Sequence, residues 1–261
     1  MRILLAGRSG PLGQALEEEL KKCGQLEILP GDPLNGAASP EDAEAALKTV
    51  SCDAVLIYPV FEKKSAGSAP SWVDNISRVS FLLEGLRRLS KPPHIVMLSS
   101  GLVYGAEISE KSEDTSRNFC PVNEKHRCRP LSFEGISMAV GDLMAEQYRR
   151  AYKLDITVLR VFALADFKKR RLICAPSPWP QSGADLIGAA DLAEAVCFAI
   201  VNDKCRNGTY NVCSGVLSKV LPAGFRADEV PLCGAGSAPA EAGDPSLFES
   251  MTGWKAEERL S

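Results

Sequence analysis

Three glycines near the start of the chain have the spacing that phosphate binding requires. Gly7, Gly10 and Gly13 follow one another at intervals of three residues, directly after the apolar run 2–6. Glycine lets a backbone approach a pyrophosphate closely, and the N-terminus of a following helix attracts negative charge. Because Gly7 ends an expected strand and Gly13 begins an expected helix, the pattern predicts a dinucleotide-binding turn, with a purely structural turn as the alternative.

The residues that would choose between the two common nicotinamide dinucleotides lie close to this turn. In such sites an Asp or Glu about 20 residues further along the chain accepts a hydrogen bond from the ribose 2′-hydroxyl. The second expected strand, 26–29, is followed by a Pro-Gly pair and Asp32, so the carboxylate is either absent or displaced to Asp32. Arg8 lies inside the glycine turn, where its charge suits a 2′-phosphate, which favours NADP over NAD. Alternatively, Arg8 is solvated and Asp32 only shapes a turn.

The elements that must position this turn alternate between strands and helices. Apolar runs bounded by turn residues predict strands at 2–6, 26–29, 54–58, 94–98, 156–161 and 210–213. Amphipathic spacing predicts helices at 12–20, 73–89, 137–152 and 191–201, one more opening at 39–42, and a helix-like piece near 247–251. The alternation predicts an α/β fold whose parallel sheet has helices on both faces.

Composition excludes several classes of protein without selecting a chemistry. The 261 residues are 45% hydrophobic and 24% charged, as in ordinary globular proteins. The net charge of −3 lacks the excess of positive charge that binding to nucleic acid or to an acidic membrane requires. No apolar run approaches the roughly 18 residues of a membrane span. We therefore expect neither a nucleic-acid partner nor a membrane partner.

The cysteines favour a reducing compartment. The chain has nine, an odd number at scattered spacings without a C-x-x-C pair, and its opening apolar run is too short for a signal peptide. We therefore expect reduced thiols and a cytoplasmic location. Cys120, His126 and Cys128 cluster, but a fourth ligand at metal spacing is missing, so we predict an ordinary loop and no metal site.

Seven segments, in order along the chain, carry a resemblance to a known family. They are 1–13, 75–86, 96–105 (VMLSSGLVYG), 159–162 (LRVF), 191–195 (DLAEA), 208–212 (GTYNV) and 253–255 (GWK). The chain resembles the NAD-dependent epimerase/dehydratase group of the extended short-chain dehydrogenase/reductases, and its start looks like dTDP-4-dehydrorhamnose reductases and UDP-galactose epimerases. The resemblance covers essentially the whole chain.

The resemblance implies a Rossmann-type, doubly wound parallel sheet with a small C-terminal substrate lobe, here shortened between 162 and 191. We assign 1–165 to the dinucleotide-binding domain and 166–261 to a reduced lobe interleaved with the last sheet strands. The implied cofactor is NAD(P). The positions expected to bind it are Gly7, Arg8, Ser9, Gly10, Pro11, Leu12, Gly13, Asp32, Tyr58, Pro59, Asn75, Ser99 and Met138.

The family's catalytic set of Ser/Thr, Tyr and Lys is only partly matched. Ser100, four residues before Tyr104, matches the Ser/Thr that hydrogen-bonds the reacting oxygen. Where the family has Tyr-x-x-x-Lys, this chain has Glu134 and Met138, and none of its five tyrosines is followed by lysine at that spacing. The resemblance therefore implies that the standard Tyr-based hydride chemistry is absent.

Glu134 has two interpretations that lead to different functions. In a dry pocket it would act with Ser100 as a non-standard acid/base in an oxidoreductase, isomerase or lyase for a sugar nucleotide or similar polar substrate. Alternatively, Glu134 faces solvent or a basic side chain, and the protein is an inactive dinucleotide-binding regulator or protein-interaction subunit.

Two further features bear on substrate and partners. The basic run 168–171 lies where relatives bind substrate phosphates, so the small-molecule substrate is expected to be phosphorylated or nucleotide-linked; a solvated basic turn is the alternative. The helices expected at 73–89 and 138–152 correspond to a dimer interface in relatives, which implies a homodimer, although core packing explains the same apolar pattern.

Overall fold

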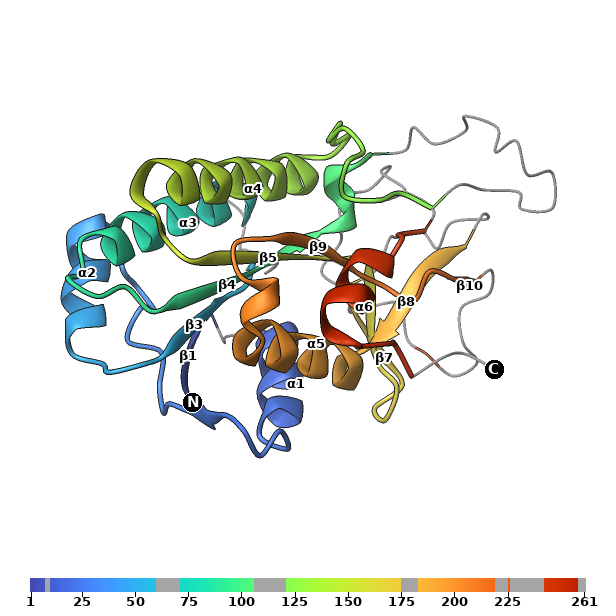
Figure 1. Ribbon diagram of the computed structural model, residues 1–261, viewed down its shortest axis with the longest axis horizontal. Coiled ribbons are helices and arrows are strands. Elements are labelled where there is room, and N and C mark those ends of the chain that lie inside the picture. The colour runs from blue at the N-terminus through green and yellow to red at the C-terminus, as the bar shows by residue number, and fades with distance from the viewer. Residues whose placement is uncertain are drawn as a thin grey trace.

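A six-stranded parallel sheet forms the centre of the molecule (Figure 1). The computed structural model describes residues 1–7, 10–59, 71–105, 121–174, 183–218, 225 and 242–257. The strand order is β2-β1-β3-β4-β5-β9, and all neighbours run parallel. These strands are β1 (Arg2–Ala6), β2 (Glu27–Ile28), β3 (Ala54–Ile57), β4 (His94–Ser100), β5 (Ile156–Val161) and β9 (Thr209–Val212). All six strands expected from the sequence lie in this sheet, which confirms the predicted fold class.

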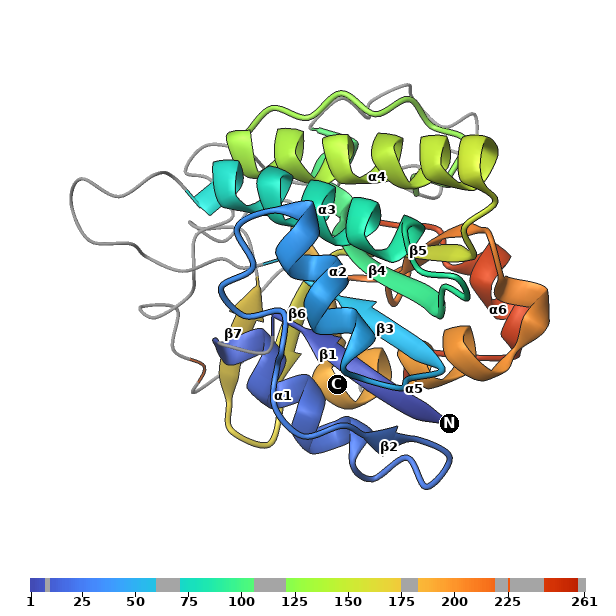
Figure 2. The ribbon, with the colours of Figure 1, turned by 90° about the vertical axis from the view of Figure 1, so that its left-hand side faces the viewer.

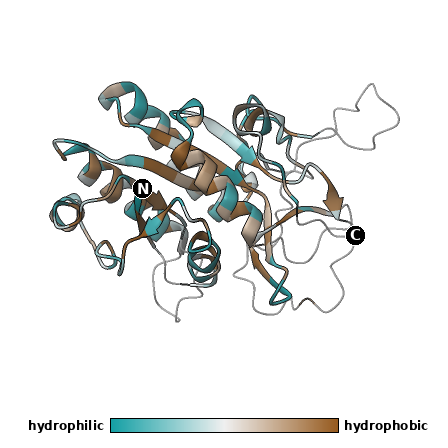
Figure 3. Ribbon diagram, turned by 60° about the horizontal axis from the view of Figure 1, so that its bottom comes forward, coloured by the Kyte–Doolittle hydropathy of each residue, from teal (hydrophilic) through white to brown (hydrophobic). Residues whose placement is uncertain are grey.

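Helices cover both faces of the sheet (Figure 2). On one face lie α1 (Pro11–Leu20) and α5 (Ala189–Val201), and on the other lie α2 (Pro40–Lys48), α3 (Ser71–Arg87) and α4 (Phe133–Tyr152). Successive strand residues point to opposite faces, so Leu5 packs with the first group of helices and Leu4 with the second. Both faces of the sheet are covered, and this explains why most strand residues are apolar, including every residue of β3 (Figure 3).

The order of the strands reverses beside β1. The chain passes from β1 to β2 on one side of it and then to β3 on the other. In open α/β sheets such a reversal leaves a crevice outside the carboxyl ends of the two strands, and ligands bind there. Gly7, directly after β1, and Tyr58, directly after β3, therefore stand at the crevice.

A second, four-stranded sheet was not expected from the sequence. Its order is β10-β8-β6-β7, with β6 (Ala163–Asp166), β7 (Arg171–Cys174), β8 (Ala184–Gly188) and β10 (Leu217–Ser218). These strands have two to five residues each, and β6 and β7 form an antiparallel hairpin, so no helical pattern separates them. Such short strands are stabilised by their neighbours, which sequence periodicity does not reveal.

Helix α4 begins at Phe133, four residues before the expected start at Ser137. The hydroxyl of Ser132 accepts a hydrogen bond from the backbone N–H of Gly135 at 3.0 Å and caps the helix there. The earlier start adds Glu134 to the helix that was already expected to contain Met138. A shorter helix, α6 (Ser246–Thr252), corresponds to the helix-like piece near the end of the chain. Among the described helices, none combines the length and apolarity that a membrane span needs.

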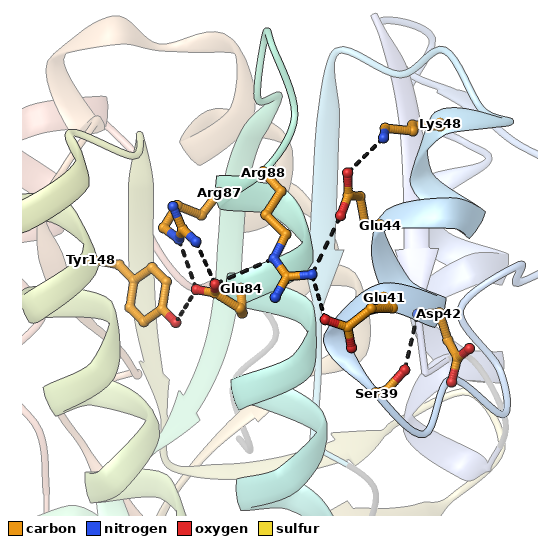
Figure 4. Close-up of polar contacts among 9 residues, drawn as sticks. All are labelled: Ser39, Glu41, Asp42, Glu44, Lys48, Glu84, Arg87, Arg88 and Tyr148. Atoms are coloured by element: carbon orange, nitrogen blue, oxygen red, sulfur yellow. Dashed lines mark hydrogen bonds and ion pairs between the residues drawn. The ribbon is translucent and has the colours of Figure 1, made fainter.

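Ion pairs join α2 to α3 on their outer side, and a hydrogen bond joins α3 to α4 (Figure 4). The carboxylate of Glu84 accepts hydrogen bonds from Arg87 Nε at 2.8 Å and from the Tyr148 hydroxyl at 3.0 Å. Arg88, the residue directly after α3, links Glu84 of that helix to Glu41 of α2, with Nη1 2.6 Å from Glu41 Oε1. The bonds from Arg87 lower the pKa of Glu84 to about 2, against partial desolvation. These contacts hold α3 and α4 beside each other.

Candidate functional site

The glycine turn has a backbone that only glycine adopts without strain. Gly7 has a φ of 98° and Gly10 a φ of 100°, in the region that side chains disfavour. Gly10 is the N-cap of α1 and Pro11 is its first residue, so the turn leads directly into a helix N-terminus. Arg8 and Ser9 lie outside the described residues. The turn therefore has the conformation and the helix start that a pyrophosphate site requires.

Asp32 lies against this turn, although 25 residues separate it from Gly7. Its Oδ2 accepts a hydrogen bond from the backbone N–H of Gly7 at 2.8 Å, and its Oδ1 accepts one from the N–H of Leu34 at 3.1 Å. The side chain is 8% exposed. The carboxylate beyond the second strand is thus beside the glycine turn and also shapes the turn that follows the strand.

Five of the predicted cofactor-binding residues line a single pocket between α3 and α4 at the carboxyl edge of the sheet. They are Tyr58, Pro59, Asn75, Ser99 and Met138. We call this space the α3–α4 pocket. The residues come from the ends of two strands and from two helices, and the sheet brings them together because parallel strands end at the same edge.

A second pocket adjoins it and shares Pro59, Leu98 and Ser99 with it. Leu12 and Ser100 also line this space, which we call the α1–β5 pocket. Its remaining walls are apolar side chains of β5, β6, β7 and α5, together with Phe162. The two pockets together run from the start of α1 to the N-terminal halves of α3 and α4.

Sequence reasoning missed one charged residue of the α3–α4 pocket, Arg78 of α3. Its Nη2 lies 3.6 Å from Asp32 Oδ2, and a Cβ built on Gly7 would lie 2.9 Å from the same Nη2. Position 78 lies in an amphipathic helix next to the apolar stripe, so the sequence offers no sign that its side chain reaches the glycine turn. The strand order decides that contact.

The two predicted catalytic residues have different surroundings. Ser100 ends β4, lines the α1–β5 pocket, and accepts a hydrogen bond from the N–H of Leu102 at 3.2 Å. Glu134 is half-buried in the first turn of α4 and lines neither of the two pockets. Ser100 is therefore placed to contact a ligand in the α1–β5 pocket, whereas Glu134 lies outside both pockets.

A buried polar network lies beside the pockets. Arg160 of β5 donates from Nε to Asp142 Oδ2 and from Nη1 to the Tyr104 hydroxyl, both at 2.8 Å. The Tyr104 hydroxyl in turn donates to Asn211 Oδ1 at 2.8 Å. Burial raises the pKa of Tyr104 to about 12, so it stays protonated at neutral pH. This tyrosine is part of a network that joins β5, β9 and α4, and it lines neither of the two pockets.

The basic run at 168–171 lies in the hairpin between β6 and β7 and contacts α1. Lys168 Nζ lies 3.2 Å from Glu19 Oε1, and Lys169 Nζ lies 2.5 Å from Glu18 Oε2. Both lysines are about half exposed or more. These surface ion pairs favour the interpretation of the run as a solvated basic turn over its interpretation as a phosphate-binding site.

The Cys120–Cys128 loop is only partly described, because Cys120 lies outside the described residues. His126 Nδ1 lies 3.2 Å from Asn123 Oδ1, and Cys128 Sγ accepts from Arg160 Nη2 at 3.5 Å. In the part of the chain that the structure describes, no group of three metal-binding side chains comes together.

Comparison with solved structures shows the same fold in proteins that were solved with NAD or NADPH. UDP-glucose 4-epimerase from Thermus thermophilus, solved with NAD, is 21% identical with a TM-score of 0.68, over 100% of this chain and 95% of that one. RMD from Pseudomonas aeruginosa, solved with NADPH, is 18% identical with a TM-score of 0.71, over 99% and 94%. dTDP-glucose 4,6-dehydratase from Bacillus anthracis, solved with NAD, is 15% identical with a TM-score of 0.70, over 99% and 92%.

The family model is the finding that assigns the chain. The model of the NAD dependent epimerase/dehydratase family matches residues 3–165, which is more than half of the sequence and contains the glycine turn, Asp32, both pockets' polar residues and the start of α4. The match agrees with the parallel sheet and the crevice described above. The chain belongs to the NAD-dependent epimerase/dehydratase family.

Proposed function

We propose that this protein binds NAD(P) across the crevice at β1 and β3 and acts on a sugar nucleotide or a similar polar substrate. One observation carries the proposal: residues predicted from separate segments of the chain line two adjoining pockets beside the glycine turn. The positive-φ glycines carry no side chain that would keep a phosphate away from the backbone, which supports a fit to the dinucleotide. NADP(H) is the preferred form in this proposal, because Arg8 lies within the turn sequence and Arg78 lies beside the turn.

Each part of the site has a role in this proposal. The glycine turn and the start of α1 bind the pyrophosphate, and Asp32 holds the turn by accepting a hydrogen bond from the N–H of Gly7. When bound, the nicotinamide supplies or accepts the hydride. Ser100 donates a hydrogen bond to the reacting oxygen in the α1–β5 pocket, whose apolar walls exclude water.

Proton transfer is the part of the chemistry that differs from the family pattern. Met138 lines the α3–α4 pocket and carries no charge, so it cannot depress the pKa of a neighbouring acid. Glu134 could transfer a proton only if the first turn of α4 brought its carboxylate to the ligand. The second candidate function is a dinucleotide-binding regulator, which the loss of the Tyr and Lys favours. Binding of a nicotinamide dinucleotide without turnover would support this function.

The direct test is titration of the purified protein with NADH and NADPH, followed by nicotinamide fluorescence. We expect saturable binding, tighter for NADPH. A Lys168→Gln variant, altered on the surface hairpin, serves as the control and should bind as the wild type does. If neither dinucleotide binds at millimolar concentration, the proposed function is wrong.

Turnover separates the enzyme from the regulator. With a panel of UDP- and dTDP-sugars, Ser100→Ala should lower any activity by at least about tenfold, since one lost hydrogen bond to the reacting oxygen costs that much. Glu134→Gln should abolish activity if Glu134 is the acid/base. Full activity in Glu134→Gln would remove Glu134 from the mechanism, and an inactive wild type that still binds dinucleotide would favour the regulator.

The predicted homodimer stays a proposal. Helix α4 exposes Phe133, Ile136 and Leu143, the last of them 71% exposed. These side chains support an interface with a second copy of the chain, since large apolar side chains tend to be covered in assemblies. Sedimentation equilibrium should show a dimer that Leu143→Glu weakens. A monomer at all concentrations would contradict the proposal.

A further inference from the structure

Arg78 is a cation in the α3–α4 pocket that is only weakly paired. Its Nε and Nη2 are buried and make no hydrogen bond within the part of the chain that the structure describes. Its ion pair with Asp32, at 3.6 Å between Nη2 and Oδ2, is longer than a hydrogen bond. A buried donor without a partner costs free energy, which binding of an anion would recover.

The guanidinium of Arg78 lies directly over the glycine turn. A Cβ placed on Gly7 would come within 2.9 Å of its Nη2 and 3.1 Å of its Cζ. The carbonyl oxygen of Tyr58 lies 3.1 Å from the same Cβ position, so the guanidinium is at the mouth of the crevice between β1 and β3. The phosphates of a dinucleotide pass this point in a sheet of this topology.

Asp32 does not depend on Arg78 for its hydrogen bonds. The backbone N–H groups of Gly7 and Leu34 each donate to one of its oxygens at 2.8 and 3.1 Å. Those two bonds remain when Arg78 moves. Arg78 can therefore exchange its long ion pair with Asp32 for a phosphate, and the carboxylate of Asp32 keeps both of its backbone hydrogen bonds.

We propose that Arg78 is a phosphate-binding side chain of this crevice: its guanidinium moves away from Asp32 and donates to phosphate oxygens of the bound dinucleotide. The planar guanidinium fork fits phosphate oxygens better than a lysine ammonium does. This inference rests on the proposed dinucleotide binding. The phosphate is either the bridging pyrophosphate, common to NADH and NADPH, or the 2′-phosphate that NADPH alone carries.

The test compares Arg78→Gln and Arg78→Lys with the wild type in titrations with NADH and NADPH. Arg88→Gln is the matched control: it removes the same charge close by on the chain, but Arg88 pairs with Glu41, Glu44 and Glu84 on the outer side of the helices. Thermal unfolding without ligand verifies that each variant folds.

We expect Arg78→Gln to raise the Kd by at least about tenfold, because a hydrogen bond to a charged group contributes that much. Arg78→Lys should lose less, and Arg88→Gln should bind as the wild type does. Equal loss for both ligands identifies the pyrophosphate, and loss for NADPH alone identifies the 2′-phosphate. Wild-type affinity of Arg78→Gln for both ligands overturns the inference and leaves the proposed function intact. Failure of the wild type to bind either ligand overturns both.

Discussion

Two arginines at the carboxyl side of the sheet differ in how they are held. Arg160 donates to Asp142 and Tyr104 at 2.8 Å, and its Cζ lies 4.9 Å from the centre of the Tyr104 ring. Arg78 has only Asp32 at 3.6 Å within the described residues, and two of its nitrogens are buried without hydrogen bonds there. The first arginine is fixed by several partners, whereas the second has unused donors beside a pocket that it lines.

The difference separates a structural role from a binding role. A buried charge with its donors used joins elements and has nothing left for a ligand. A charge with spare donors beside a positive-φ glycine stands where a ligand's phosphates would go. Removing a partner of Arg160 should therefore affect stability, and removing Arg78 should affect binding.

The largest effect is expected from Asp142→Ala. The substitution leaves Arg160 buried without its carboxylate, and breaking such a pair costs about 3–5 kcal/mol of the free energy of unfolding. Urea unfolding measures the loss. The double variant Asp142→Ala, Arg160→Met should recover part of it, because no uncompensated charge remains. A loss below about 1 kcal/mol in the single variant would show that the pair does not hold β5 and α4 together.

The next effect is expected from Gly7→Ala, which acts on the other arginine. An alanine at a φ of 98° is strained by about 1–2 kcal/mol, and its Cβ would displace Arg78. Both the unfolding free energy and the affinity for NADPH should fall. Gly24→Ala is the matched control, because its Cβ meets nothing within 4 Å and its φ is not positive. Unchanged NADPH binding in Gly7→Ala would contradict the position assigned to the phosphates.

A smaller effect on stability is expected when acid protonates Glu84 in the partly exposed ion-pair cluster at the end of α3. The folded pKa of Glu84, about 2, is below its ordinary value of 4.5, because Arg87 donates to the carboxylate. The unfolded chain therefore binds the proton more readily. The stabilisation is complete above pH 4.5 and is lost as pH falls towards 2. Because the cluster is partly exposed, we expect less than about 1 kcal/mol, measured as the difference in urea unfolding between wild type and Glu84→Gln across this range.

The smallest change in stability is expected from Arg78→Gln. The long ion pair contributes little, and removal of buried, unpaired donors offsets its loss, so the free energy of unfolding should stay within about 0.5 kcal/mol of the wild type. Urea unfolding of Arg78→Gln beside Asp142→Ala tests the contrast directly. Similar large losses in both variants would show that Arg78 is as structural as Arg160.

Much of the fold could be read from local patterns in the sequence. The six sheet strands have apolar runs of their own, and the helices have amphipathic spacing, so periodicity is sufficient to find them. The four short strands between 163 and 218 lack such a pattern, and the capping by Ser132 moved the start of α4 towards the N-terminus. Strands of two to five residues form because neighbours pair with them, which is information that no local window contains.

The sequence by itself determined the parallel α/β architecture, the glycine turn and the absence of a Tyr-x-x-x-Lys motif, because each is a matter of residue type at a given spacing. Only the tertiary structure decided that Asp32 closes on Gly7 and that Arg78 reaches over the same glycine. Those contacts join residues 25 and more positions apart. They depend on the order of the strands in the sheet, which brings the ends of β1, β2 and β3 to one edge.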